Sequence, residues 1–493
     1  MVAIKISDID NVAIALKDLE KGQTIQVGGI SLVLKEDVQR GHKFALQDIS
    51  DKSPIVKYGA QIGLATTDIA QGCWVHTHNV RTSLSEKEDY HYNKIPVAQR
   101  TATGATFSGY LRADGRAATR NELWIIPMVG CVNGVANRLV EKNQSLVSGS
   151  IDGLLAFPHP YGCSQLGGDL KNTRKLLSSL VRHPNAGGVL VLSLGCENNT
   201  LAGFKEELGP YDSNRVKFLT CQESTDELAE GGKLLEELAV FARQAKRQEL
   251  STSKLVIGLK CGGSDGLSGI TANPVVGNFS DRLVAEGGTS ILTEVPEMFG
   301  AENLLLGRCK NEDIYSQAVD MIRSFKDYFV AHDQMVYENP SPGNKDGGIT
   351  TLEDKSCGCV QKGGTGEITS VLSYAEHATT PGVNLMWGPG NDLVSSTALA
   401  ASGALIVLFT TGRGTPFGCP VPTLKISSNT PLYEKKPNWI DFNAGGVATG
   451  EEDIETSGER LFEKVRECAS GQKALNEING YKEIAIFKDG VVL

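Results

Sequence analysis

The feature that most constrains the fold is an alternation of apolar β-forming runs with amphipathic segments, which begins near residue 109. Eight runs have the composition of buried strands: 123–129, 153–157, 188–194, 216–220, 254–259, 290–295, 382–386 and 405–410. Five segments between them carry apolar residues at helical spacing: 170–183, 223–248, 274–286, 314–332 and 392–401. Apolar strands separated by amphipathic helices are typical of a mainly parallel sheet covered on both faces. We therefore predict a large α/β region.

The chain before this region follows a different pattern. Short β-forming runs at 24–27, 30–34 and 55–58 are separated by glycine turns, which predicts a small, mostly β domain over residues 1–82. A polar stretch follows, and we expect residues 83–108 to form a linker. A Pro/Gly-rich break at 339–348 predicts that the α/β region is split into two domains, 109–338 and 339–493.

Charge and hydropathy exclude several classes of protein. Lys and Arg total 48 and Asp and Glu total 58, so the formal charge is −10, which argues against a general binder of nucleic acid or anionic membranes. No run approaches the ~20 apolar residues of a spanning helix, and the first residues lack the apolar stretch of a leader. We expect a cytoplasmic protein, in which the 11 cysteines stay reduced rather than forming a disulfide framework.

A polar segment directly follows five of the strand candidates. Ligands bind beyond the carboxyl ends of strands in parallel sheets, so these segments predict one shared pocket. Turn formation explains glycine and asparagine there, but it does not call for cysteine after four separate strands. The side chains concerned are His159, Cys163, Cys196, Glu197, Asn198, Cys221, Lys260, Cys261, Ser264, Asp265, Glu294 and Glu297.

Several of these residue types are metal ligands. Cysteines 163, 196, 221, 261, 357 and 359 are candidate soft ligands, and Glu197, Glu294 and His159 are candidate harder ones. His76 and His78 would project to the same side of a strand. No paired CxxC motif or HExxH motif is present, which argues against structural zinc. The thiols are dispersed along the chain, so we expect a transition-metal ion rather than an iron–sulfur cluster.

Two glycine-rich loops follow later strands. Residues 387–392 include Asn391, and residues 410–419 include Arg413. Backbone N–H groups in such loops bind anions, and an arginine fork suits a carboxylate. Neither loop has a dinucleotide or P-loop fingerprint, so the sequence gives little support for nucleotide binding.

Nine segments in order along nearly the whole chain resemble the family of altronate, galactarate and sulfolactate dehydratases. They are Trp74–Asn79, Tyr110–Glu122, His159–Gln165, Gly195–Asn198, Lys260–Pro274, Thr293–Phe299, Ser356–Gly364, Gly388–Asp392 and Thr410–Gly418. The resemblance implies an N-terminal SAF-type β domain before the α/β region. It also implies a hydro-lyase that uses Fe²⁺, with Mn²⁺ as a substitute. The substrate we expect first is D-altronate, dehydrated to 2-keto-3-deoxy-D-gluconate.

Elimination of water from a sugar acid needs a base, a stabiliser of the enediolate and help for the leaving hydroxyl. We expect proton transfer and charge stabilisation from Lys260, Asp265, Glu197 and Glu294. Lys260 would act as the base only if burial lowered its pKa. We expect metal ligands among Cys163, Cys196, Cys261, Cys357, His76 and His78. We expect substrate contacts from Arg413, Asn198, Ser264 and Asn391.

Other functions remain as alternatives. Galactarate or another aldarate would use the same chemistry. The α/β pattern also suits an NAD-dependent sugar-acid dehydrogenase, but the missing dinucleotide fingerprint counts against it. A non-catalytic module that binds a sugar acid or a metal would not need so many polar strand ends. We expect a small sugar acid as the partner, with no nucleic acid and no membrane. The sequence does not define the oligomeric state, and a homodimer is one option.

Overall fold

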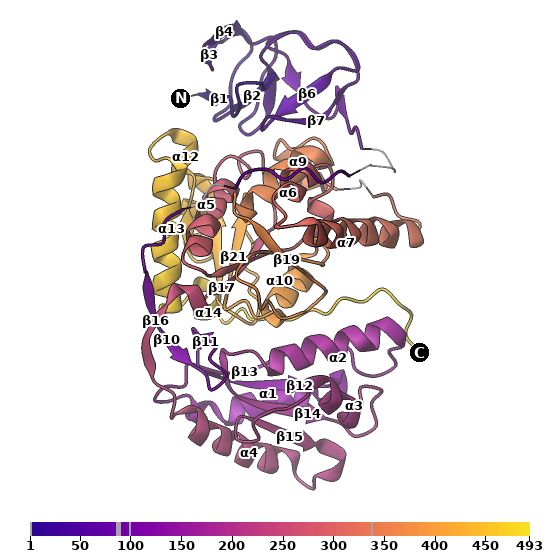
Figure 1. Ribbon diagram of the computed structural model, residues 1–493, viewed down its shortest axis with the longest axis vertical. Helices are drawn as coiled ribbons and strands as arrows, with labels where there is room; N and C mark the ends of the chain where they lie inside the picture. Colours follow the sequence, from indigo (N-terminus) through magenta and orange to yellow (C-terminus); the bar gives the residue numbers. More distant parts are fainter. Residues whose placement is uncertain (1, 85–89, 98–99, 337–338) are drawn as a thin grey trace.

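The computed structural model describes residues 2–84, 90–97, 100–336 and 339–493, which form three parts stacked along the long axis (Figure 1). The N-terminal β domain lies at one end. The C-terminal domain, which holds a seven-stranded sheet, lies in the middle. The second domain, which holds a four-stranded sheet, lies at the other end (Figure 1).

The N-terminal β domain is built from three small antiparallel sheets, as its alternating short runs and glycine turns predict. The first sheet contains β1 (Ala3–Ile4), β2 (Val12–Ala15), β5 (Lys43–Ala45) and β8 (Trp74–Val75). The second is the hairpin β3 (Thr24–Val27) and β4 (Ile30–Val33). The third contains β6 (Pro54–Lys57), β7 (Ala60–Ala65) and β9 (Val80–Arg81). Buried aliphatic side chains and Phe44 fill its interior.

The second domain has a parallel sheet in the order β13-β12-β14-β15. Its strands are β12 (Glu122–Pro127), β13 (Gly153–Ala156), β14 (Ala186–Ser193) and β15 (Val216–Thr220). Its helices are α1 (Asn133–Lys142), α2 (Gly167–Val181), α3 (Leu201–Leu208) and α4 (Glu227–Ala242). All eight residues of β14 are buried, because helices cover both faces of the central strands.

The C-terminal domain has a parallel sheet in the order β19-β20-β18-β17-β21-β22-β23. Its strands are β17 (Val256–Cys261), β18 (Thr289–Leu292), β19 (Ile368–Leu372), β20 (Gly382–Met386), β21 (Ile406–Thr411), β22 (Thr423–Ser427) and β23 (Phe442–Asn443). Its longer helices are α5 (Ala272–Ala285), α7 (Glu312–Ala331), α9 (Leu352–Cys359), α10 (Asp392–Ala401) and α13 (Ile454–Ala469). Shorter helices are α6 (Glu302–Leu306), α8 (Pro342–Asp346), α11 (Thr430–Lys435), α12 (Gly446–Thr449) and α14 (Leu475–Ile478).

All eight strands and all five helices expected in the α/β region are present. The helix expected over 223–248 ends at Ala242, however, and residues 247 and 248 lie in a strand. The division of this region differs from the one expected at residues 338 and 339. β17 and β18 precede that point and β19 to β23 follow it, yet all seven strands share one sheet. The change of sheet falls between β15 and β17, where β16 (Arg247–Ser251) pairs antiparallel with β10 (Thr106–Leu111), itself paired with β11 (Ala117–Ala118).

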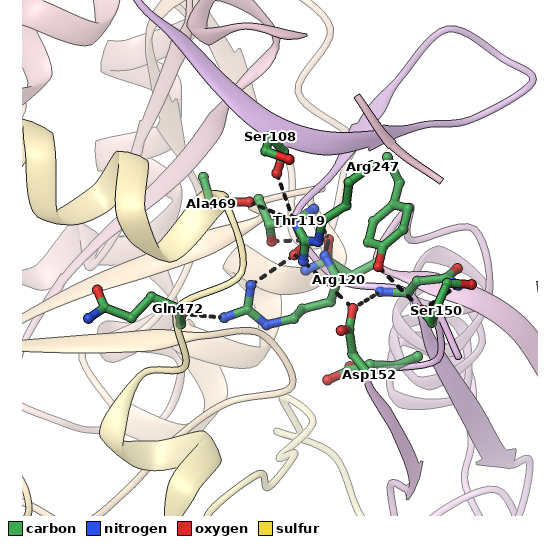
Figure 2. A network of polar contacts seen from close by, with 12 residues as sticks. Ser108, Thr119, Arg120, Ser150, Asp152, Arg247, Ala469 and Gln472 are labelled. Carbon is green, nitrogen blue, oxygen red and sulfur yellow. Dashed lines mark hydrogen bonds and ion pairs between the residues drawn. The ribbon is translucent and has the colours of Figure 1, made fainter. Parts of the chain in front are cut away.

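The two α/β domains meet at a polar joint beside this ribbon (Figure 2). The buried guanidinium of Arg120 donates to both carboxylate oxygens of Glu477, at 2.8 and 2.7 Å, and to the carbonyl oxygens of Cys468 and Gln472. Arg247 lies next to it and donates to the carbonyl oxygen of Thr119. Arg247 also donates to the carbonyl oxygen of Ala469 at 3.3 Å, so both arginines connect the residues around β11 to the C-terminal segment.

Within the expected linker, residues 90–97 pack against the C-terminal domain. The backbone N–H of Ile95 donates to the carbonyl oxygen of Gly307, and the hydroxyl of Tyr92 donates to that of Cys309. Residues 90–97 therefore lie along the C-terminal domain. Among the described residues, no helix is both long enough and apolar enough to cross a membrane.

Candidate active site

The candidate site lies at the carboxyl ends of β17 and β18, where a parallel sheet places its ligands. Lys260 and Cys261 are the last two residues of β17, and Glu294 comes shortly after β18. The Lys260 ammonium contacts the Glu294 carboxylate and lies 3.0 Å from Asp392 at the start of α10. Neighbouring strand ends therefore bring a buried cation and carboxylates together.

Glu294 is held in an unusual position. It has a left-handed backbone with φ of 70° and is fully buried. Its carboxylate accepts hydrogen bonds from the backbone N–H of Cys261 at 3.0 Å and from the ammonium of Lys362 at 3.2 Å. Burial, together with the neighbouring Glu297 carboxylate, raises the pKa of Glu294. A non-glycine residue with this backbone costs energy, and such residues concentrate at functional sites.

Helix α9 and the turn after it supply the other wall. Lys355 and Cys359 are four residues apart on this helix, so they share a face. The Lys355 ammonium lies 2.7 Å from the carboxylate of Glu297, which also accepts from the Cys261 thiol at 2.9 Å. The attraction of Lys355, Lys362 and Lys260 outweighs burial and lowers the pKa of Glu297.

Three of these side chains have the arrangement of a metal site. The Cys261 and Cys359 sulfurs are 3.5 Å apart, and they lie with a Glu297 oxygen within 4.8 Å of one another. The hydrogen bond from Cys261, reinforced by burial, raises the pKa of the Cys359 thiol. The two thiols would lose two protons when a divalent ion binds, so the net charge of this buried group would not change. Two thiolates and a carboxylate suit a transition metal such as iron.

A small cavity lies beside Cys359 and Lys355. Asp265 lines it, and its carboxylate accepts from the hydroxyls of Ser268 and Ser428, both at 2.8 Å. The N-terminal β domain contributes Tyr58 to the lining. The cavity therefore forms where the β domain meets the C-terminal domain.

Docking of the β domain rests on a buried ionic contact. Lys43 and Lys57 lie 2.8 and 3.1 Å from the carboxylate of Asp354 on α9. One carboxylate does not fully offset two buried ammonium groups, and burial lowers the pKa of Lys43 to about 8. For Lys57, Asp354 and Tyr58 outweigh burial and the pKa is raised.

Family models match all three parts of the chain. The "Altronate/galactarate dehydratase SAF domain" matches residues 1–83, and the "D-galactarate dehydratase/Altronate hydrolase, second domain" matches residues 109–243. The "D-galactarate/Altronate dehydratase, C-terminal" domain matches residues 252–492. The chain belongs to the galactarate/altronate dehydratase family. The matched ranges coincide with the β domain and the two sheets of the structure.

Relatives within this family align over their whole length. The chain is 52% identical to an altronate dehydratase of Bacillus subtilis (strain 168), over 99% of each chain. It is 51% identical to an altronate dehydratase of Escherichia coli (strain K12), over 100% of each chain. It is 34% identical to a galactarate dehydratase (L-threo-forming) of Escherichia coli (strain K12), over 99% of this chain and 97% of the relative.

The structure brings together five of the residues that we expected at a dehydratase site. Lys260, Cys261 and Glu294 lie in the buried cluster, and Ser264 and Asp265 line the adjacent cavity. Lys260 does not fit the role of base, because Glu294 and Asp392 outweigh burial and raise its pKa. It is a charged partner of Glu294 rather than a neutral amine.

Two other expected residues lie at the edge of this region. The Asn391 side chain accepts from the backbone N–H groups of Leu393 and Val394, so it caps α10. Arg413 is exposed, and its guanidinium donates to the carbonyl oxygen of Gly343. These contacts give both residues a role in shaping loops around the site.

Four expected residues lie on a different sheet. Cys163, Cys196, Glu197 and Asn198 follow β13 and β14, at the carboxyl edge of the second domain. The Glu197 carboxylate accepts from the backbone N–H groups of Leu194 and Gly195, and Asn198 accepts from that of Ser164. We expected one pocket because the chain alternates strands and helices throughout, but the strands divide between two sheets.

Three expected metal ligands, Cys357, His76 and His78, are not part of the Cys261–Glu297–Cys359 group in the described structure. Cys357 lies two residues before Cys359 on α9, and such residues face different sides of a helix. His76 and His78 follow β8 in a turn rather than in a strand, and their rings lie 5.1 and 4.9 Å from that of Trp74. The side chain of His76 is half-buried and its Nδ1 has no hydrogen-bond partner in the described structure.

Two residues of the site, Lys355 and Lys362, were not among those we expected. Cys359 was a candidate soft ligand left out of the final ligand set, and Glu297 was expected at the pocket without a role. The sequence does contain a signal for Lys355 and Cys359. Thr351 caps α9 through its hydroxyl, and recognising this helix start would have placed Lys355 and Cys359 on one face. Lys362 lies in a short 3-10 turn after the helix, which has no comparable sequence signal.

Proposed function

We propose that the chain is a metal-dependent hydro-lyase that converts D-altronate to 2-keto-3-deoxy-D-gluconate. The observation that carries this proposal is the identity of 52% and 51% to two altronate dehydratases over essentially the whole of each chain. The buried cluster of thiols, carboxylates and ammonium groups supports the same chemistry. We place the reaction in the cytoplasm, where the thiols stay reduced.

The metal in this proposal is Fe²⁺, with Mn²⁺ as the substitute, held by Cys261, Cys359 and Glu297. Such an ion supplies a Lewis acid that polarises the oxygen atoms of a bound sugar acid. Glu294 and Lys362 lie beside this group but are not ligands. They form an ion pair with each other, which limits the free-energy cost of burying their charges. The requirement for iron follows from the family resemblance, and the donor set of the site fits it.

The remaining chemistry falls to side chains at the cavity. The Asp265 carboxylate takes the proton from C2, since three donors, the hydroxyls of Ser268 and Ser428 and the amide of Asn429, fix its orientation. The Lys355 ammonium stabilises the negative charge that develops on the substrate carboxylate. The C2–H electrons form the C2=C3 double bond, and the C3 hydroxyl leaves as water with the proton that Asp265 took from C2. The enol then becomes the 2-keto acid.

The test is a substrate panel. The protein is purified without oxygen, loaded with ferrous iron in the presence of a thiol, and supplied separately with altronate, galactarate, mannonate and gluconate. We expect 2-keto acid from altronate alone, and only when iron is present. Faster turnover of galactarate would support the second candidate, for which the 34% identity to a galactarate dehydratase is the observation. No product from any of the four acids would reject the proposed function.

A further inference from the structure

The carboxyl edge of the four-stranded sheet carries one cysteine after each strand. Cys131 follows β12, Cys163 follows β13, Cys196 follows β14 and Cys221 follows β15. We call these four side chains the thiol edge. Three of them are exposed and Cys221 is half-buried, whereas six of the other seven cysteines are buried. Cysteine is among the most buried residue types, so three exposed cysteines on one sheet edge call for an explanation.

The loops that carry the thiol edge are tied directly to one another. The backbone N–H of Gly130 donates to the carbonyl oxygen of Tyr161 at 2.8 Å, and that of Asn199 donates to Gly162 at 2.9 Å. The side-chain amide of Gln222, next to Cys221, lies 3.3 Å from the Cys196 sulfur. These contacts hold the four loops together over the end of the sheet.

Glycine precedes three of the four cysteines, and the packing requires it at two of these positions. A Cβ atom on Gly162 would lie 2.1 Å from the carbonyl oxygen of Met128, and Gly162 has φ of +100°. A Cβ atom on Gly195 would lie 2.7 Å from the side-chain oxygen of Gln222, and Gly195 has φ of +125°. The backbone before Cys163 and Cys196 therefore approaches the neighbouring loop more closely than another residue type would allow.

Three helices begin beside the thiol edge. Helices α1, α2 and α3 each begin a few residues after Cys131, Cys163 and Cys196, so their positive ends point to the carboxyl edge of the sheet. The positive end of a helix favours a negatively charged group bound beside it. Ser164 has a positive φ of 56°, which is a strained conformation for a serine.

We propose that Cys131, Cys163, Cys196 and Cys221 bind an iron–sulfur cluster at the carboxyl edge of the second domain. This centre is distinct from the Cys261–Glu297–Cys359 group, which belongs to the other sheet. Four cysteine thiolates are the usual ligand set of such a cluster. Among the described residues, no three of these thiols lie within 4.8 Å of one another, whereas the group at Cys261 does.

The experiment measures cluster content rather than turnover. The protein is reconstituted without oxygen using ferrous iron and sulfide, and its iron, acid-labile sulfide and visible charge-transfer absorption are determined. The variants are C163S/C196S, which removes two thiols of the edge, and C261S/C359S, which removes the thiols of the other site. C73S is the control, because Cys73 lies in the β domain. Thermal melting checks that every variant is folded.

We expect the natural protein, C261S/C359S and C73S to bind sulfide and to absorb in the visible. We expect C163S/C196S to melt at the same temperature as the natural protein but to bind about tenfold less sulfide, because two of the four cluster ligands are gone. Equal sulfide in C163S/C196S and the natural protein would overturn the proposal, as would iron uptake at these thiols without sulfide. Sulfide content does not depend on the substrate, so this result is independent of the altronate assay.

Discussion

At the scale of residues, the charge of each buried group at the site is defined by its neighbours. Lys260 is fully buried, and its partners Glu294 and Asp392 keep it protonated. Glu297 forms an ion pair with Lys355 and accepts a hydrogen bond from the Cys261 thiol, so its carboxylate stays ionised. Sequence alone placed Lys260 and Glu294 at strand ends, but it gave no information on which partner each would meet. That information depends on Asp392 at the start of α10 and on Lys362 in the turn after α9, which lie far along the chain from β17 and β18.

Lys355 provides the first prediction. Replacing it with methionine removes the ammonium that we place at the developing charge of the substrate, and the hydrocarbon chain keeps much of the packing. We expect kcat for altronate to fall about 10²–10³-fold, as when one stabilising donor is lost from an active site. Steady-state kinetics of Lys355→Met and of the control Lys345→Met, on the neighbouring helix α8, check this. Unchanged kcat in Lys355→Met would remove the residue from the mechanism.

At the scale of elements, the sequence predicted strands more reliably than the direction of their side chains. Each of the eight runs expected as strands in the α/β region is a strand, because buried β-formers flanked by turns leave few alternatives. The Cys357-Gly-Cys359 motif was less informative, because two cysteines at this spacing share a side only on a strand. On a helix they diverge, and α9 directs Cys359 alone to the site.

Helix α9 also carries the contact that docks the β domain, which gives the second prediction. Asp354→Asn leaves Lys43 and Lys57 buried without a negative partner, so we expect a loss of about 3–5 kcal/mol in the free energy of unfolding. Asp51→Asn, at an exposed pair in the β domain, should change it by less than about 0.5 kcal/mol. Urea unfolding of both variants measures the difference, and equal midpoints would refute the role of Asp354.

The same contact predicts a dependence on pH. Lys43 and Lys57 outweigh burial and hold the pKa of Asp354 well below its ordinary value. A lowered carboxyl pKa contributes stability that is complete above the ordinary value of about 3.9 and is lost as the pH falls further. The advantage of the natural protein over Asp354→Asn should therefore shrink below about pH 4. Denaturant midpoints measured from pH 6 downward check this, and a constant difference would contradict it.

At the scale of the whole molecule, the sequence predicted a β domain followed by α/β structure but not the division between the sheets. The Pro/Gly-rich break at 339–348 lies inside the C-terminal domain, where it carries α8 and the start of the wall around the site. The actual joint is the antiparallel β10–β16 ribbon, whose strands are more than 130 residues apart. Such pairing has no local signal in a single sequence.

The joint in Figure 2 gives the fourth prediction. Arg120→Met removes the cation that pairs with Glu477 at 2.7 Å and leaves that carboxylate almost fully buried. We expect a loss of about 3–5 kcal/mol in the free energy of unfolding. Arg138→Ala, at an exposed pair on α1, should cost only about 0.2–0.5 kcal/mol. Guanidinium unfolding measures both, and a loss in Arg120→Met no larger than that in the control would show that the joint is not held by this arginine.

We propose that the Cys261–Glu297–Cys359 group holds the metal of an altronate dehydratase. The most direct measurement compares Cys359→Ser with Cys357→Ser, since both thiols are buried on α9 and only Cys359 belongs to the group. Both variants are loaded with ferrous iron without oxygen and assayed with altronate. We predict near-normal turnover for Cys357→Ser and a loss of at least about 10–100-fold for Cys359→Ser, with the iron concentration for half activation raised. Equal turnover and equal iron dependence in the two variants would contradict the account.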